Sequence, residues 1–304
     1  MNRNSNVYTV IYATVLTVLV AVLLSAAALG LKDKQKANTD NEKKQQILMS
    51  VASKLGKDVT FDNAAEIWNE LKMQENMFCV NTKGEKVDGN AFDIASKSLF
   101  TAGKIKADAT LPVYVANIDG VPYTIMSMYG AGLWGPIWGY MAVDPQGNVA
   151  GASFDHDSET AGLGAKIKDD PAFAAAFIGK NIFTNGKFTS VSVTKPGKPA
   201  NYGGEKVDAI TGATKTSDYV GSMIYESLLG YVPLLQQGVA SSCEEGKADC
   251  CKQSDSECCK KGEMSCDKAC ADKKCCKEQA CNECPMMGEG SACSELCDAC
   301  NKAE

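Results

Sequence analysis

The strongest structural signal in this chain is the stretch LPVYVANI-DG-VPYTIMSM, residues 111–128. Two runs of apolar, aromatic and β-branched residues, 111–118 and 121–128, flank the pair Asp119-Gly120. An Asp-Gly pair between two such runs is a strong signal for a β-hairpin, because both central positions of its tight turn need a positive φ. The stretch therefore predicts two adjacent antiparallel strands.

A second hairpin is predicted directly downstream of the first. Apolar runs at 137–143 and 149–154 flank a turn-forming Asp-Pro-Gln-Gly at 144–147. Residues 188–193 alternate apolar and polar side chains, which predicts a half-buried strand. Because the predicted strands occur as consecutive hairpins and do not alternate with helices along the sequence, the pattern indicates an α+β fold.

Helices are predicted on either side of the hairpins. Apolar residues recur every four positions from Ile47 to Leu55, as on one face of a helix. Asp62 is expected to cap the next helix. Further helices are predicted at 171–178, which begins with a proline, and at 217–229.

The N-terminal part of the chain predicts a membrane anchor. Residues 7–31 carry no charge, and as a helix they would extend about 37 Å, against about 30 Å of bilayer hydrocarbon. A cleaved signal peptide is the competing interpretation, because residues 25–28 are small. The run is longer than the usual apolar core of a signal peptide, which favours an uncleaved anchor. Flanking charges do not settle its orientation.

Composition excludes several classes of function. The formal net charge is −6, which argues against a nucleic-acid binder. The single histidine, His156, excludes catalysis by cooperating histidines and any metal site that needs two of them. Since Asp155 and Asp157 flank it, His156 is expected to be a solvated loop residue.

Three glycine-containing stretches stand out, at 130–136, 159–164 and 208–217. The first two lack a Gly-x-Gly-x-x-Gly pattern between a strand and a helix, so they predict turns and no dinucleotide site. The third is rich in hydroxyls and runs into a predicted helix, whose N-terminus could bind a phosphate. Gly212 would allow close approach of a ligand. Plain helix capping by Ser or Thr is the commoner explanation of such a stretch.

The third stretch reads Asp208-Ala-Ile-Thr-Gly-Ala-Thr214, which matches a covalent-flavinylation motif of bacterial membrane flavoproteins. The apolar run, the segment 31–38 (LKDKQKAN), Gly-Leu-Trp at 132–134 and Glu-Thr-x-Gly-Leu-Gly at 159–164 occur in the same order. Together they resemble the C subunits of the Na⁺-translocating NADH:quinone reductases, over roughly residues 5–235. Ala161 departs from the pattern, which has proline there.

The resemblance implies one FMN per chain, joined through its phosphate to Thr214 by a separate FMN transferase that recognises Asp208. No catalytic residue is expected, since the flavin carries the redox chemistry. The residues that the resemblance implies around the flavin are Leu133, Trp134, Glu159, Thr160, Gly162, Leu163, Gly164, Thr211, Gly212, Ala213, Lys215 and Thr216.

The family also implies a place in the cell. The chain would be an electron-transfer subunit in a complex of the bacterial inner membrane that oxidises NADH, reduces ubiquinone and moves Na⁺. The NADH and quinone sites belong to other subunits. A single span would contact lipid and hold the main domain on the periplasmic side. The alternative within the superfamily is the G subunit of the Rnf ferredoxin:NAD⁺ complex, although segment 31–38 favours the quinone-reductase family.

The sequence divides into an N-terminus with anchor (1–36), an FMN-binding domain (37–242) and a tail (243–304) that holds 14 of the 15 cysteines. The tail has too few apolar residues for a hydrophobic core. Thiolate metal binding, disulfides and disorder remain open, and no metal ligand set is assigned. The most suggestive pairs are Cys281 with Cys284 and Cys297 with Cys300. A membrane-anchored thiolate metal-binding protein is therefore the rival function.

Overall fold

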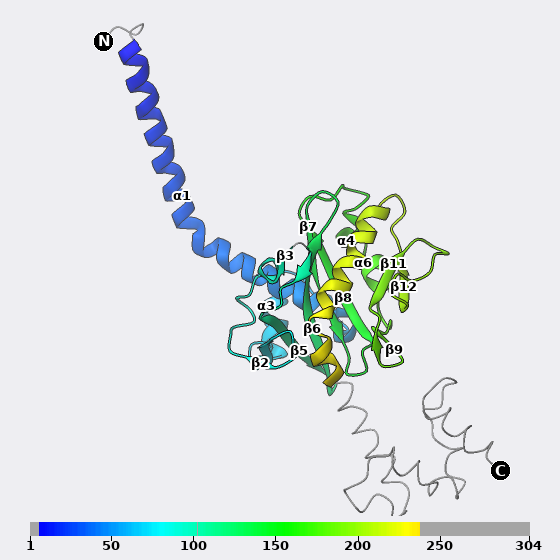
Figure 1. The fold of residues 1–304 in the computed structure, drawn as a ribbon. Helices are drawn as coiled ribbons and strands as arrows, with labels where there is room; N and C mark the ends of the chain where they lie inside the picture. The colour runs from blue at the N-terminus through cyan, green and yellow to red at the C-terminus, as the bar shows by residue number, and fades with distance from the viewer. Residues whose placement is uncertain (1–5, 102, 238–304) are drawn as a thin grey trace, which may run out of the picture.

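The computed structural model describes residues 6–101 and 103–237, so the predictions for the cysteine-rich tail lie outside the described residues. The domain is built on one antiparallel six-stranded sheet (Figure 1). In spatial order its strands are β2 (Lys86–Val87), β1 (Met77–Val80), β5 (Leu111–Ile118), β6 (Val121–Ala131), β7 (Pro136–Val143) and β8 (Val149–His156).

Both predicted hairpins are confirmed. Asp119 and Gly120 have φ of 51° and 80°, as a two-residue turn requires, and Ile118 pairs with Val121. β6 extends beyond its predicted end at residue 128, because its pairing with β7 continues to Ala131.

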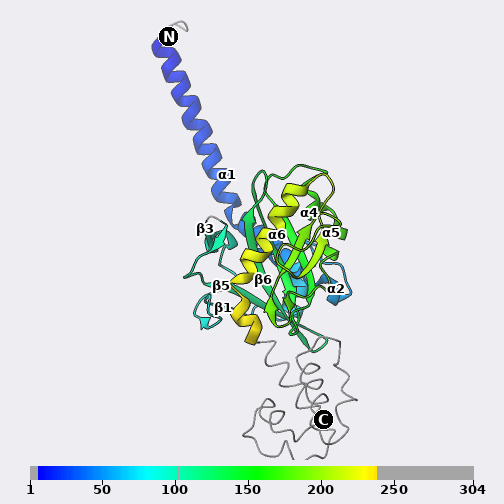
Figure 2. The same ribbon diagram turned by 45° about the vertical axis from the view of Figure 1, so that its right-hand side comes forward.

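Both faces of the sheet are covered, which gives three layers. Alternate residues of β5 enter different cores: Val113 faces one, and Tyr114 faces the other. The end of α1 (Asn6–Met49) and α3 (Ala64–Glu70) pack on the Tyr114 side, while α6 (Thr214–Leu229) crosses the opposite side (Figures 1 and 2). This arrangement confirms the α+β class.

Helix α1 is longer than predicted. It spans 44 residues without interruption, so no break separates the apolar segment from the first part of the domain. It ends at Met49, and a turn separates it from α2 (Ala52–Leu55), where a single helical face was predicted. Among the described residues, α1 alone is long and apolar enough to cross a membrane. Figure 1 shows its N-terminal part projecting away from the domain.

The cap predicted for α3 is wrong by one residue. Asn63 stands at the N-cap, and its Oδ1 atom accepts the Thr60 N–H at 2.8 Å. The apolar face of the helix is as expected, with Ile67 and Trp68 each only 1% exposed.

The predicted strand at 188–193 is also wrong, because Ser190 has a φ of 59° and breaks it. The chain forms β10 (Lys187–Phe188) and then β11 (Val191–Thr194), which is fully buried and therefore does not alternate. β11 pairs in parallel with β12 (Glu205–Asp208) and packs on α6. The remaining elements are η1 (Ser96–Leu99), β3 (Phe100–Thr101), β4 (Lys104–Ile105), α4 (Lys166–Asp169), α5 (Pro171–Ala175) and β9 (Phe183–Thr184).

Candidate functional site

The three glycine-containing stretches meet at the carboxylate of Glu159. Its Oε1 atom accepts the backbone N–H groups of Leu133 at 2.6 Å and Trp134 at 3.1 Å. Its Oε2 atom accepts the hydroxyl of Thr216 at 2.7 Å. Glu159 is only 7% exposed, so these bonds are shielded from water. One side chain therefore ties together the β6–β7 turn, the loop after β8 and the first turn of α6.

The Glu159 carboxylate occupies space that is free because two neighbouring residues are glycines and have no side chain. A Cβ atom on Gly132 would lie 2.5 Å from Glu159 Oε1, and one on Gly164 would overlap Glu159 Oε2. Gly132 also closes the β6–β7 turn by donating its N–H to the Gly135 carbonyl at 2.7 Å. The glycines predicted to be turn residues therefore have a second role in packing around Glu159.

Thr214 is the first residue of α6, three residues before the predicted start of that helix. The N-cap is Ala213, which has no side chain able to cap, so neither Thr211 nor Thr214 acts as the expected N-cap. Ser217 instead folds back, accepting the Ile210 N–H and donating to the Ala213 carbonyl, both at 3.0 Å. The N–H groups of the first turn of a helix have no intrahelical acceptor and give this end partial positive charge.

A basic depression surrounds the exposed side of Thr214. It has a volume of about 490 Å³. Its lining residues are Thr194, Lys195, Lys198, Pro199, Asn201, Thr214, Lys215 and Asp218. Three ammonium groups against one carboxylate make the depression suited to an anion, and Lys215 lies 3.9 Å from Asp218. A phosphate placed here would meet both these lysines and the helix N-terminus.

Large apolar side chains are exposed at the same end of the domain. Trp134 is 66% exposed, and Leu133 and Leu163 are exposed by 44% and 43%. Gly212 has a φ of 83°, and a Cβ atom on it would come within 3.0 Å of Leu163 Cδ2. The loop that carries Leu163 thus lies against the loop that leads to Thr214. Such a surface suits a planar aromatic ligand whose phosphate end is anchored at α6.

The other predicted residues are placed less centrally. Thr160 and Gly162 are exposed in the loop after β8, where the Thr160 carbonyl accepts the N–H groups of Leu163 and Ala165. Asp208 is exposed at the end of β12. Together with Thr211 it borders a different depression, of about 520 Å³. These two residues therefore do not line the depression around Thr214.

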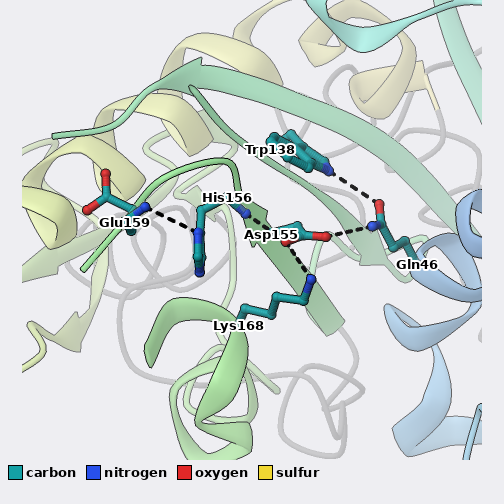
Figure 3. A network of polar contacts seen from close by, with 6 residues as sticks. All are labelled: Gln46, Trp138, Asp155, His156, Glu159 and Lys168. Carbon is teal, nitrogen blue, oxygen red and sulfur yellow. Dashed lines mark hydrogen bonds and ion pairs between the residues drawn. The ribbon is translucent and has the colours of Figure 1, made fainter. Parts of the chain in front are cut away.

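A polar network that no sequence pattern indicated leads into this site (Figure 3). His156 is not the solvated loop residue that was expected, because it ends β8, is half-buried and accepts the Glu159 N–H at its Nδ1 atom, 3.3 Å away. Asp155, only 4% exposed, accepts from Gln46 of α1 at 2.8 Å and pairs with Lys168 at 2.8 Å. Trp138 donates to Gln46 at 3.3 Å. In the part of the chain that the structure describes, no cluster of acidic, His and Cys residues could hold a metal ion.

Comparisons with known proteins agree with this geometry. Residues 132–228 match the family model of the FMN-binding domain, so the chain contains a domain of the FMN-binding class. The matched region includes Trp134, Glu159 and Thr214.

Relatives define the family more closely. The C subunit of the Na(+)-translocating NADH-quinone reductase of Vibrio vulnificus is 33% identical over 224 residues, which cover 67% of this chain and 84% of that protein. Its counterpart in Neisseria meningitidis is 30% identical and covers 75% of this chain and 93% of its own. The crystal structure of the same subunit from Parabacteroides distasonis is 45% identical, with a TM-score of 0.60 over 67% of this chain and 96% of that one.

The chain belongs to the family formed by the C subunits of the Na(+)-translocating NADH-quinone reductases. The resemblance inferred from the sequence is therefore confirmed. This membership supports the quinone-reductase interpretation over both the G subunit of an Rnf complex and a thiolate metal-binding protein.

Proposed function

We propose that this chain is an electron-transfer subunit of a Na⁺-translocating NADH:quinone reductase and carries one FMN, attached through its phosphate to Thr214. The observation that carries the proposal is the position of Thr214. It begins α6 inside a depression lined by Lys195, Lys198 and Lys215, beside the exposed Leu163.

The phosphate end of FMN fits the chemistry of this depression. A phosphoester on Thr214 keeps a negative charge, which the N-terminus of α6 and the three lysines stabilise. The Thr214 side chain makes no hydrogen bond to any other described residue and is half-buried. Its hydroxyl is consequently available for modification without the loss of a structural contact.

The ring end of FMN fits the exposed apolar surface. Trp134, Leu133 and Leu163 offer an aromatic face and two aliphatic side chains, and Glu159 fixes the backbone that carries the first two. A bound flavin supplies the electron transfer. The protein binds and orients it, and its buried carboxylate is already engaged by three donors. NADH and quinone would react at other subunits of the complex.

Attachment by a separate FMN transferase accords with the exposure of the motif. Asp208, Thr211 and Gly212 are all exposed. They precede Thr214 on the surface and leave it reachable by a second protein. We assign the recognition of Asp208 to this transferase, since Asp208 does not line the depression that would hold the phosphate.

The apolar part of α1 would anchor the chain as a single span in lipid of the bacterial inner membrane. None of its most apolar window is buried in the domain, as expected of a helix that packs against lipid or against other subunits. The family resemblance supports a periplasmic location of the domain.

In-gel flavin fluorescence of the denatured full-length chain, co-expressed with an FMN transferase, tests the attachment. Wild type and Thr101→Ala, which replaces an exposed threonine of β3 outside the motif, should give a fluorescent band of the size of the chain, and Thr214→Ala should give none. Mass spectrometry of the Thr214 peptide should show the added FMN. A wild-type chain that stays dark beside an active transferase, or a Thr214→Ala chain that fluoresces, would overturn the proposal.

A further inference from the structure

The loop that bears Glu159 is held by its neighbours in the chain as well as by its own carboxylate. The Glu159 N–H group donates to Nδ1 of His156, and the His156 N–H donates to Asp155 Oδ1 at 2.8 Å (Figure 3). A neutral histidine that accepts at Nδ1 carries its proton at Nε2. The backbone of Glu159 is therefore oriented by a specific atom of the only histidine in the sequence.

Asp155 connects this arrangement to the anchor helix. Its Oδ2 atom accepts the side-chain amide of Gln46, which is in the last turn of α1. Its Oδ1 atom also pairs with Lys168 of α4. Ser153 strengthens the same junction, because its hydroxyl donates to the Gln46 carbonyl at 2.7 Å. Strand β8 is thus bonded to α1 just where its last two residues turn toward the site.

The contacts form one continuous path through the domain. From Gln46 it passes to Asp155, to His156 and to Glu159, and from the Glu159 carboxylate it reaches Trp134 and Thr216. Asp155 and Glu159 are almost fully buried, at 4% and 7% exposed, so water competes little for these bonds. The β6–β7 turn, the loop after β8 and the first turn of α6 are all oriented by the path.

We propose that His156 is a positioning residue of the flavin site. Its Nδ1 atom fixes the backbone of Glu159, and together with Asp155 it fixes the position of the site relative to the anchor helix α1. The inference rests on the proposed function in treating Leu133, Trp134 and Thr214 as the flavin surroundings. It assigns His156 no contact with the flavin and no proton transfer.

Two polar substitutions separate positioning from mere packing. In His156→Asn the side-chain oxygen takes the place of Nδ1, whereas in His156→Gln it lies farther out, near the place of Nε2. Both variants keep a polar, half-buried side chain, so they should fold alike. Glu205→Gln is the matched control, because it weakens the 3.1 Å ion pair with Lys180 in the same domain, away from α1 and Glu159.

Hydrogen exchange of the flavin-free full-length chain tests the path without any cofactor. His156→Gln should speed exchange of the amides at 133, 134 and 159 roughly fivefold, the effect of losing one hydrogen bond. His156→Asn and Glu205→Gln should exchange like wild type there, and residues 139–143 of β7 should be unchanged in all three. Equal exchange in the Gln and Asn variants, fast or slow, would overturn the proposal.

The flavin-loaded chain gives a second, separate readout. Once the covalent band is present on a gel, the visible circular dichroism of the flavin should change in His156→Gln and be restored in His156→Asn. An identical spectrum in both variants contradicts a role in positioning the flavin. Absence of the covalent band in wild type would contradict the proposed function alone, because the exchange experiment does not depend on flavin.

Discussion

The Thr216 hydroxyl donates to Glu159 Oε2 at 2.7 Å, and both side chains are less than 10% exposed. This bond joins the first turn of α6 to the loop after β8, which are 57 residues apart in the chain. Because Thr216 lies two positions beyond Thr214, the bond determines how the start of α6 is oriented against the β6–β7 turn.

Replacement of Thr216 by valine should destabilise the domain by about 1–3 kcal/mol, because it keeps the shape but leaves a buried carboxylate oxygen without its donor. Thr211→Val, at an exposed position, should change stability by no more than about 0.5 kcal/mol. Urea unfolding of both variants measures the difference. Equal stabilities would show that the bond to Glu159 contributes nothing.

Gly164→Ala should be more harmful than Gly162→Ala. At Gly164 the added methyl group would overlap Glu159 Oε2 and lie 2.8 Å from Thr216 Oγ1, so the junction has to open. Gly162 has open space around it, and only its φ of 73° opposes alanine, at a cost of about 1–2 kcal/mol. Thermal unfolding together with the yield of flavinylated chain compares them. A Gly164→Ala variant as stable as Gly162→Ala would contradict the packing described here.

Trp134→Ala should leave stability within about 0.5 kcal/mol of wild type, since the side chain is 66% exposed. It should nevertheless raise the fluorescence of the attached flavin, because it removes the aromatic face that we propose contacts the flavin ring. Leu229→Ala is the control, an exposed residue about 22 Å along α6 from Thr214. If both variants leave flavin emission unchanged, Trp134 does not face the ring.

Alkaline pH should unfold the domain through its buried tyrosines. Burial raises the pKa values of Tyr114, Tyr140 and Tyr231 far above the usual value of about 10. The unfolded chain therefore loses these protons first, and above pH 10 it binds fewer protons than the folded chain. Stability is then fully present below about pH 10 and falls as the pH rises beyond it.

The measurement is the free energy of unfolding between pH 8 and 11.5. Each buried tyrosine should contribute a slope of up to about 1.4 kcal/mol per pH unit above its unfolded pKa. Tyr231→Phe should reduce that slope by the contribution of one tyrosine, up to about 1.4 kcal/mol per pH unit. The substitution also removes the hydrogen bonds to Ser127 and to the Pro112 carbonyl. A slope unchanged by this substitution would mean that Tyr231 ionises as easily in the folded chain as in the unfolded chain.

Truncation after residue 242 should preserve both the stability of the domain and the flavinylation of Thr214. Among the residues that the structure describes, the last two buried in the core are Tyr231 and Leu235, and both are retained. Thermal unfolding and in-gel fluorescence of the truncated chain check this. Loss of the flavin band on truncation would assign the tail a part in maturation.

Local signals were sufficient to predict four strands of the central sheet, β5 to β8, but the strands β1 and β2 at its other edge were not predicted. Asp119-Gly120 specifies the turn between β5 and β6 through backbone conformation alone, and the flanking apolar runs specify the strands. The break at Ser190 could not be anticipated, because a positive φ at a serine arises from tertiary contacts and has no sequence signature. Likewise, the choice of Asn63 over Asp62 depends on the bond to Thr60.

The candidate site also has parts that the sequence could predict and parts that it could not. The motif singled out Thr214, and the resemblance singled out Leu133, Trp134 and Glu159; their roles at a flavin remain predictions. Their junction through one carboxylate was not predictable, because it joins segments 26 and 57 residues apart. The contact of Gln46 with Asp155 spans 109 residues, and nothing in the local pattern around either residue points to the other.

Because α1 runs without interruption from the apolar segment into the domain, the number of residues in this helix determines where the domain lies and which way it faces. From Leu31, the end of the uncharged run, to Ile47, the first residue buried in the domain, the helix rises about 24 Å. Figure 1 shows that α1 bends as it approaches the domain. Each residue added before this bend would move the domain by about 1.5 Å along the axis of the N-terminal part of α1 and rotate it by about 100° about that axis. Two extra residues would turn Thr214 toward a different neighbour, whereas about seven would restore its bearing about 10 Å higher. With the proposed membrane span and the proposed flavin on Thr214, the number of residues in α1 would set both the distance of the flavin from the bilayer and the direction in which it faces.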